Sequence, residues 1–238
     1  MSLDAVKALT FDVFGTVVDW RGSIAREAES VLAPKGYALD WAAFADAWRA
    51  RYQPAMQEIR SGARPFAKLD ILHRENLDAT LPEFGVSGLT EAELEHLNRA
   101  WHRLTPWPDA PEGLRRLKQK YIIATQSNGN VALMVNMAKA GGLPWDVILG
   151  AEVCGAYKPM PQAYLRAAEL LDLPPEQCMM TAAHNDDLKA AARTGFRTAF
   201  VARPTEKGPN QTIDLVADPS IDIAASSFIE LADKLGCP

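Results

Sequence analysis

The segment Ala8-Leu-Thr-Phe-Asp-Val-Phe-Gly-Thr16 decides the fold of this 238-residue chain. It is rich in β-branched and aromatic residues and runs into a glycine, which predicts a buried strand followed by a sharp turn. A buried strand that ends in a carboxylate must give that group a partner or a chemical task. Asp12 is therefore a candidate nucleophile, and the alternative is that it only caps the next segment.

The rest of the chain divides into a helical part and an alternating part. Residues 21–101 carry helical spacing with short interruptions and no strand-like run, and one helix is expected to pass through Phe44, Trp48 and Tyr52. After Pro106 and Pro108, helices alternate with apolar runs at 121–125, 147–149, 178–181 and 198–201. This alternation predicts a parallel sheet covered on both faces. We expect an α/β protein whose doubly wound, Rossmann-like core (residues 1–18 and 106–238) carries an inserted all-helical cap (residues 19–105).

Composition narrows the function classes. A net charge of −5 and a pI near 5.4 argue against nucleic acid or an anionic membrane as the main partner. Three cysteines, Cys154, Cys178 and Cys237, lack any Cys-x-x-Cys spacing, so we expect buried thiols and neither a disulfide framework nor a zinc site. The chain has no leader-like start and no run of eighteen apolar residues, which predicts a cytoplasmic protein.

Polar side chains follow several of the predicted strands. In open parallel sheets, ligands bind beyond the carboxyl ends of the strands, which gathers Asp12, Gln126-Ser-Asn-Gly129, Lys158 and Ala182-Ala-His-Asn-Asp-Asp187 at one edge. Lys158 would favour the ionised form of Asp12, and Thr16 would orient it. Asp186 and Asp187 provide a candidate base or a partner for Lys158. Read one at a time, these residues are helix caps, a solvated lysine and a structural histidine, so the prediction rests on their combination.

Four stretches resemble the ordered motifs of the haloacid dehalogenase superfamily: Asp12-Val-Phe-Gly-Thr16, Ser127-Asn128, Lys158-Pro159 and Asp187. Phosphatases of this superfamily place an acid two residues after the nucleophile, whereas this chain has Phe14, which resembles the (S)-2-haloacid dehalogenase (type II) branch. Phosphatases also carry Gly-Asp in the fourth motif, where this chain has Ala183-His184. Replacing a hard oxygen ligand by an imidazole argues against a Mg²⁺ site.

The resemblance also implies roles for single residues. Trp48-Arg49 resembles the Trp-Arg pair whose arginine reaches from the cap toward the departing halide, and Asn128 would join it there. Ser127 and the N–H groups near Phe14 would hold the substrate carboxylate, and Tyr164 matches a position that supports the site. Asp187 would position Lys158 and assist the water. His184 departs from the Ser-Ser-Asn of well-matched members and would orient that water or act as its base.

The resemblance therefore predicts a hydrolytic dehalogenase that converts short 2-haloalkanoic acids to 2-hydroxy acids through a covalent aspartyl ester. It implies no metal and no cofactor, a small haloacid as the partner molecule, and a homodimer. One alternative is a Mg²⁺-dependent phosphatase acting on a small phosphate ester. A further alternative is a binding protein that keeps the fold without catalysis.

Overall fold

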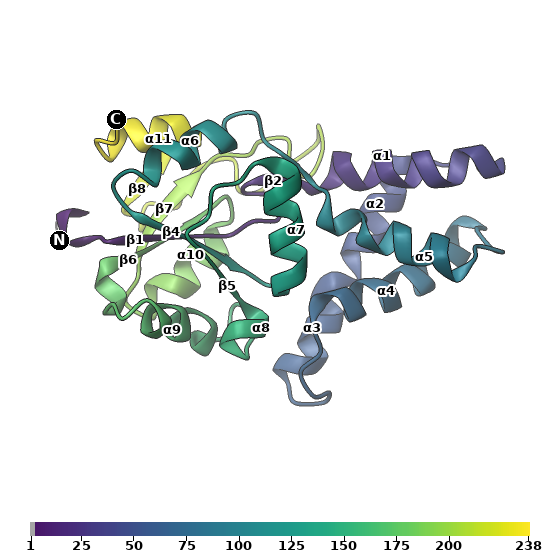
Figure 1. The fold of residues 1–238 in the computed structure, drawn as a ribbon, viewed down its shortest axis with the longest axis horizontal. Helices are drawn as coiled ribbons and strands as arrows, with labels where there is room; N and C mark the ends of the chain where they lie inside the picture. Colours follow the sequence, from purple (N-terminus) through teal and green to yellow (C-terminus); the bar gives the residue numbers. More distant parts are fainter. Residues whose placement is uncertain (1–2) are drawn as a thin grey trace.

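The structure is a computed structural model of the chain, and it describes residues 3–238, so that residues 1 and 2 of the predicted core lie outside the described residues. Figure 1 shows a sheet-containing core with a group of helices, α1 to α5, packed at one end. Both chain termini lie at the opposite end of the core. This arrangement confirms the predicted α/β core with an inserted helical cap.

Six parallel strands form the core sheet in the order β5-β4-β1-β6-β7-β8. The central strand β1 pairs with β4 on one side and β6 on the other, and Phe11 stands opposite both Thr125 and Thr181. The segments that follow these three strands therefore emerge at one level of the same sheet edge. The strands are β1 (Ala8–Phe11), β4 (Ile122–Ser127), β5 (Val147–Gly150), β6 (Cys178–Ala182), β7 (Arg197–Val201) and β8 (Ile223–Ala225).

Helices cover both faces of the sheet because alternate residues of its strands point to opposite sides. Leu9 and Phe11 of β1 pack in one apolar cluster with α6 (Ala110–Leu117), α7 (Val131–Gly141) and α11 (Phe228–Lys234). Ala8 and the strand β6 residue Met180 pack in a second cluster with α9 (Pro161–Leu170) and α10 (Asn185–Ala192). The short helix α8 (Ala151–Cys154) lies against α9.

The chain enters and leaves the cap through a short antiparallel pair, β2 (Val18–Asp19) and β3 (Thr105–Pro106). We propose that the domain boundary lies at this pair. Asp19 also caps the first cap helix by accepting from the N–H of Gly22. The cap helices are α1 (Trp20–Leu32), α2 (Trp41–Ala50), α3 (Tyr52–Arg60), α4 (Leu69–Thr80) and α5 (Glu91–Asn98).

One predicted cap helix is in fact two. α2 ends at Ala50 and α3 begins at Tyr52. Pro54 explains the break, because it has no N–H to donate to the carbonyl of Ala50 and its ring clashes with that carbonyl in a continuous helix. The prediction of a single helix through these residues is wrong at this point.

The aromatic residues of the cap form its own core. Phe44, Trp48, Tyr52 and Trp101 are all buried, and Trp48 packs edge-on against both Phe44 and Trp101. The sequence leaves open whether these four rings and that of Trp41 pack inside the cap or against a partner chain. The structure places the four rings inside and leaves Trp41 half-buried against the same apolar cluster.

The prediction of buried thiols is confirmed for two of the three cysteines, and Cys154 is the exception. Cys178 and Cys237 are buried, Cys154 is half-buried, and all three are free. Within residues 3–238, no helix combines the length and the apolar character needed to cross a bilayer.

Candidate active site

The turn after β1 places the side chain of Asp12 at the carboxyl ends of the sheet strands. Gly15 adopts φ +87°, a conformation that an L side chain rarely takes. The turn brings the hydroxyl of Thr16 to 2.7 Å from Asp12 Oδ2, to which it donates. Thr16 is itself fixed, because its Oγ1 accepts from the backbone N–H of Ala183 at 2.9 Å. The first and fourth motifs are thus joined through one hydroxyl.

Lys158 bridges two carboxylates. Its ammonium donates to Asp12 Oδ1 at 2.9 Å and to Asp187 Oδ2. Asp187 Oδ1 also accepts from the hydroxyl of Tyr164 at 2.6 Å. The backbone N–H of Lys158 donates to Asn128 Oδ1 at 2.9 Å, which ties the second motif to the third. Asp187 is therefore held from two sides and in turn holds the lysine.

The charges of the site keep one another ionised. Burial alone would raise the pKa of Asp12, but the charge of Lys158 and the hydrogen bonds from His184 and Thr16 hold it well below its usual range. Burial alone would lower the pKa of Lys158, but Asp12 and Asp187 raise it above its usual value. Asp12 is therefore a carboxylate at neutral pH, as a nucleophile requires.

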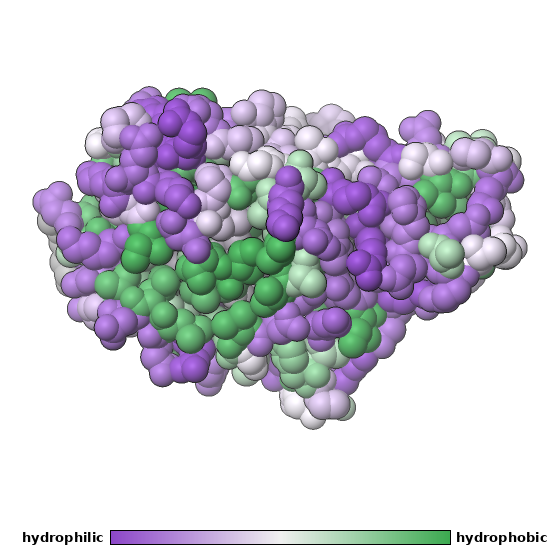
Figure 2. Space-filling model, in the orientation of Figure 1, coloured by the Kyte–Doolittle hydropathy of each residue, from purple (hydrophilic) through white to green (hydrophobic). Residues whose placement is uncertain are grey.

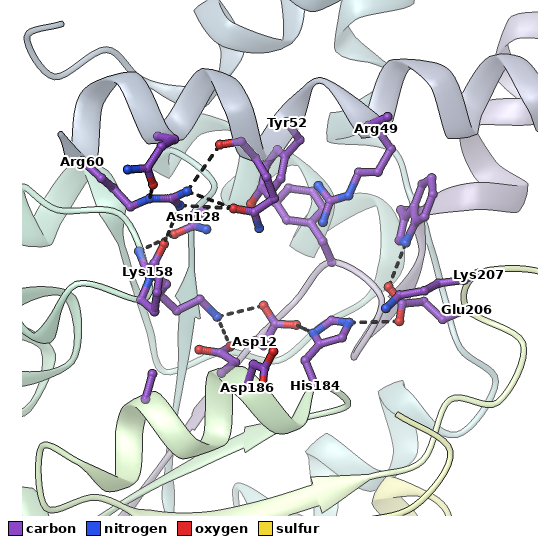
Figure 3. A pocket seen from close by; sticks show the side chains of 18 of the residues that line it. Asp12, Arg49, Tyr52, Arg60, Asn128, Lys158, His184, Asp186, Glu206 and Lys207 are labelled. Atoms are coloured by element: carbon purple, nitrogen blue, oxygen red, sulfur yellow. Dashed lines mark hydrogen bonds and ion pairs between the residues drawn. The ribbon is translucent and has the colours of Figure 1, made fainter. Parts of the chain in front are cut away.

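The imidazole of His184 lies between two carboxylates. Its Nδ1 is 3.2 Å from Asp12 Oδ2, and its Nε2 is 2.9 Å from Oε2 of Glu206. Glu206 is only 3% exposed and accepts at Oε1 from the indole N–H of Trp20 at 3.0 Å. Figure 3 shows Lys158, Asp12, His184 and Glu206 side by side along one wall of the cavity.

Glu206 was missed by the sequence reasoning, although a signal existed. It lies in the loop after β7, which neighbours β6 in the sheet, so the rule that located the other residues also covers this strand end. Gly15 makes its close approach possible, because a Cβ at that position would come within 2.1 Å of Glu206 Oε1.

Arg49 reaches from the cap into a cage of aromatic rings. Its guanidinium carbon is 3.8 Å from the ring centre of Tyr52 and 5.4 Å from those of Phe14 and Trp20. Such contacts stabilise a cation without neutralising it. Within the part of the chain that the structure describes, no carboxylate pairs with Arg49, and its buried Nη1 has no hydrogen-bond partner. The site therefore presents a positive group with an unused donor.

These groups surround a cavity of about 1010 Å³ between core and cap. Eight of the predicted site residues line this cavity, and three lie behind them. Thr16 and Tyr164 contact the lining residues Asp12 and Asp187, and the hydroxyl of Ser127 accepts from the N–H of Gly129 at 3.1 Å. The cavity is also lined by Gln53, Gln57, Arg60 and Arg193. The eight predicted residues that line the cavity are Asp12, Phe14, Arg49, Asn128, Lys158, His184, Asp186 and Asp187.

Comparison with known proteins agrees with this geometry. The family model of haloacid dehalogenase-like hydrolases matches residues 6–195. The chain therefore belongs to the haloacid dehalogenase-like hydrolase family.

Its relatives confirm the predicted branch. The chain is 29% identical to (S)-2-haloacid dehalogenase 4A of Burkholderia cepacia over 204 residues, which cover 84% of this chain and 85% of that one. The crystal structure of the defluorinating L-2-haloacid dehalogenase Rha0230 is similar with a TM-score of 0.95 and 53% identity, covering 98% and 96% of the two chains. The crystal structure of the L-2-haloacid dehalogenase PA0810 is similar with a TM-score of 0.93 and 48% identity, and the match covers 97% of this chain and 99% of that chain.

Proposed function

We propose that the chain is a 2-haloacid dehalogenase that hydrolyses the carbon–halogen bond of 2-haloalkanoic acids through an ester on Asp12, without a metal ion. The observation that carries this proposal is the unpaired guanidinium of Arg49, which faces the same cavity as the Asp12 carboxylate (Figure 3). A buried cation without a counter-ion is costly unless a ligand supplies the negative charge. A departing halide is such a ligand. The relatives named above, all 2-haloacid dehalogenases, support the same substrate class.

In the first step, an oxygen of Asp12 attacks the carbon that bears the halogen. The electron pair of the carbon–halogen bond leaves with the halide, which Arg49 and the amide N–H group of Asn128 stabilise. Because Asn128 Oδ1 accepts from the backbone of Lys158, its Nδ2 remains available on the cavity side. A halide needs no proton, which agrees with Phe14 standing where phosphatases carry an acid.

In the second step, water attacks the carboxyl carbon of the ester. Asp187 is the proposed acceptor of the water proton, since it is held by Tyr164 and Lys158 within reach of the Asp12 side of the cavity. The bond between the ester oxygen of Asp12 and the substrate carbon does not break in this step. The product is therefore a 2-hydroxy acid whose configuration is inverted relative to the substrate.

The donor set fits Mg²⁺ poorly. Mg²⁺ takes oxygen ligands in near-octahedral geometry. Here Asp12 Oδ1 accepts from the ammonium of Lys158, while Oδ2 accepts from Thr16 and faces the imidazole of His184. An imidazole paired with Glu206 adds positive charge where a metal would need another carboxylate. We therefore propose catalysis without metal or cofactor.

A halide-release assay with excess EDTA tests this function. We expect the wild-type protein to release halide from fluoro-, chloro- and bromoacetate and to convert (S)-2-chloropropionate to (R)-lactate. The size of the cavity leads us to expect that longer 2-haloacids are also accepted. Silence across this panel, together with phosphate release from small phosphate esters in Mg²⁺, would instead support the phosphatase alternative.

We also propose that the chain forms a homodimer through its core. Figure 2 shows a broad apolar area on the face of the core over α7, β5, α8 and α9. These helices carry exposed Val131, Val153, Leu165 and Leu170, and β5 is an edge strand of the sheet. Monomeric proteins rarely expose apolar patches of large area, and a second copy would cover this one.

Light scattering after size exclusion tests the dimer. We expect twice the 26.0 kDa of one chain for the wild type and a monomer for the Leu165→Glu, Leu170→Glu double variant. Ile229→Glu on α11, also an exposed apolar position, is the control and should stay dimeric. A wild-type monomer would refute the proposal.

A further inference from the structure

Both ring nitrogens of His184 are occupied. Nδ1 faces Asp12 Oδ2 and Nε2 faces Glu206 Oε2, and both of these oxygens are acceptors. A ring that donates from both nitrogens is an imidazolium and has no lone pair to offer a water molecule. Burial would lower its pKa, but the charge of Glu206 and the hydrogen bonds to Asp12 and Glu206 raise the pKa of His184 to about 10. This geometry argues against the predicted role of His184 as a base.

The two oxygens of Asp12 are not equivalent. Oδ2 accepts from Thr16 at 2.7 Å and lies 3.2 Å from His184 Nδ1, whereas Oδ1 accepts from Lys158 at 2.9 Å and from no other side chain of residues 3–238. Each hydrogen bond to a carboxylate oxygen makes its lone pairs less available for attack on the substrate carbon. Oδ1 is therefore the better nucleophile, and Oδ2 becomes the carbonyl oxygen of the ester.

We propose that the ring of His184 and the hydroxyl of Thr16 form an oxyanion hole for hydrolysis of the Asp12 ester, and that Glu206 is the residue that positions this ring. The inference rests on the proposed function, since it concerns the second step of that reaction. Preorganised donors aimed at the oxygen on which charge develops are among the largest contributions to enzymatic rates.

The step balances as follows. Water attacks Cγ of Asp12, the electron pair of the carbonyl bond moves onto Oδ2, and one water proton passes to Asp187. When the carbonyl re-forms, the bond between Cγ and Oδ1 breaks. The departing alkoxide takes a proton from Lys158, which recovers one from Asp187, its direct partner. Asp12 then releases its remaining proton to solvent, and the 2-hydroxy acid is free.

Glu206 gains importance once the ester has formed. The charged groups around the ring are Asp12 at the end of β1 and Glu206 in the loop after β7, with Lys158 beyond Asp12 and Lys207 beside Glu206. Esterification removes the charge of Asp12, so Glu206 becomes the one carboxylate that keeps the ring protonated among the residues that contact it. Trp20 fixes Glu206 in this position.

Rapid-quench mass spectrometry of the protein with chloroacetate tests the oxyanion hole. We expect His184→Ala to form the ester but to hydrolyse it about 10²- to 10³-fold more slowly, so that ester accumulates. His184→Asn keeps a neutral N–H donor near Oδ2 and should fall between the alanine variant and the wild type. Ester that forms and hydrolyses at the wild-type rate in His184→Ala would overturn this inference alone. A wild type that forms no ester would overturn the proposed function as well.

The pH profile of ester hydrolysis distinguishes a His184 ring that donates to the oxyanion from one that acts as a base for the water. An imidazolium donor is lost as the pH rises, so we expect the wild-type rate to be flat near neutrality and to fall on the alkaline side. Glu206→Gln keeps the shape of the side chain but removes its charge, and should move this alkaline limb to lower pH by at least about one unit. A limb in which the rate falls toward acid, centred near neutral pH and absent from His184→Asn, would instead identify His184 as a base and overturn the inference.

Discussion

Replacing Asp12 with Asn is expected to lower halide release by about 10⁴-fold or more, because an amide oxygen is a far weaker nucleophile than a carboxylate. The fold should survive the change, since each neighbouring cation keeps a second carboxylate. Lys158 retains Asp187, and His184 retains Glu206. Initial rates with chloroacetate, combined with thermal unfolding, measure both effects.

Asp172→Asn is a suitable control for this variant. Asp172 is exposed, lies outside the cavity and has φ 55°, a conformation that asparagine accepts readily. Its halide release should match the wild type. Turnover within tenfold of the wild type in Asp12→Asn would contradict the nucleophile assignment. A wild type without turnover that still binds haloacids, with Asp12→Asn binding them equally, would support the alternative of a non-catalytic binding protein.

The sequence predicted those site residues whose position depends on sheet topology, namely the polar residues that follow the strands. Parallel strands that pair in register deliver their following residues to one edge, so a list of polar residues at strand ends locates Asp12, Lys158 and Asp187 together. The alternation of helices and apolar runs likewise predicted the core and the cap, because period and length distinguish the two kinds of element.

The features that the sequence did not reveal depend on contacts between distant segments. Trp20 begins the cap and Glu206 lies in a loop of the core, yet the two share a hydrogen bond. The role of Ser127 also depends on local geometry, since its hydroxyl turns to the N–H of Gly129 and the residue lies outside the cavity lining. The elements that were not expected are mostly short, such as β2 and β3 with two residues each, and a period cannot be read from two residues.

Replacing Arg49 with Met is expected to slow ester formation by about 10³-fold while leaving ester hydrolysis unaffected. Methionine fills the space between Tyr52, Phe14 and Trp20 but offers no charge to the departing halide. Because the loss of cation–π contacts is offset by removal of a buried donor without a partner, we expect little change in the melting temperature. Rapid-quench mass spectrometry should therefore find no accumulated ester, in contrast to the His184 variants.

Comparing substrates with different halogens tests whether Arg49 stabilises the departing halide. Fluoride concentrates the developing charge on a small atom and is the poorest leaving group of the series, so it depends most on the guanidinium. The rate loss in Arg49→Met should therefore be larger with fluoroacetate than with bromoacetate. Arg51→Met is the control, since Arg51 pairs with Glu83 outside the cavity and its loss should leave both rates unchanged. An equal loss with all halogens would mean that Arg49 binds the substrate as a whole and does not stabilise the departing halide.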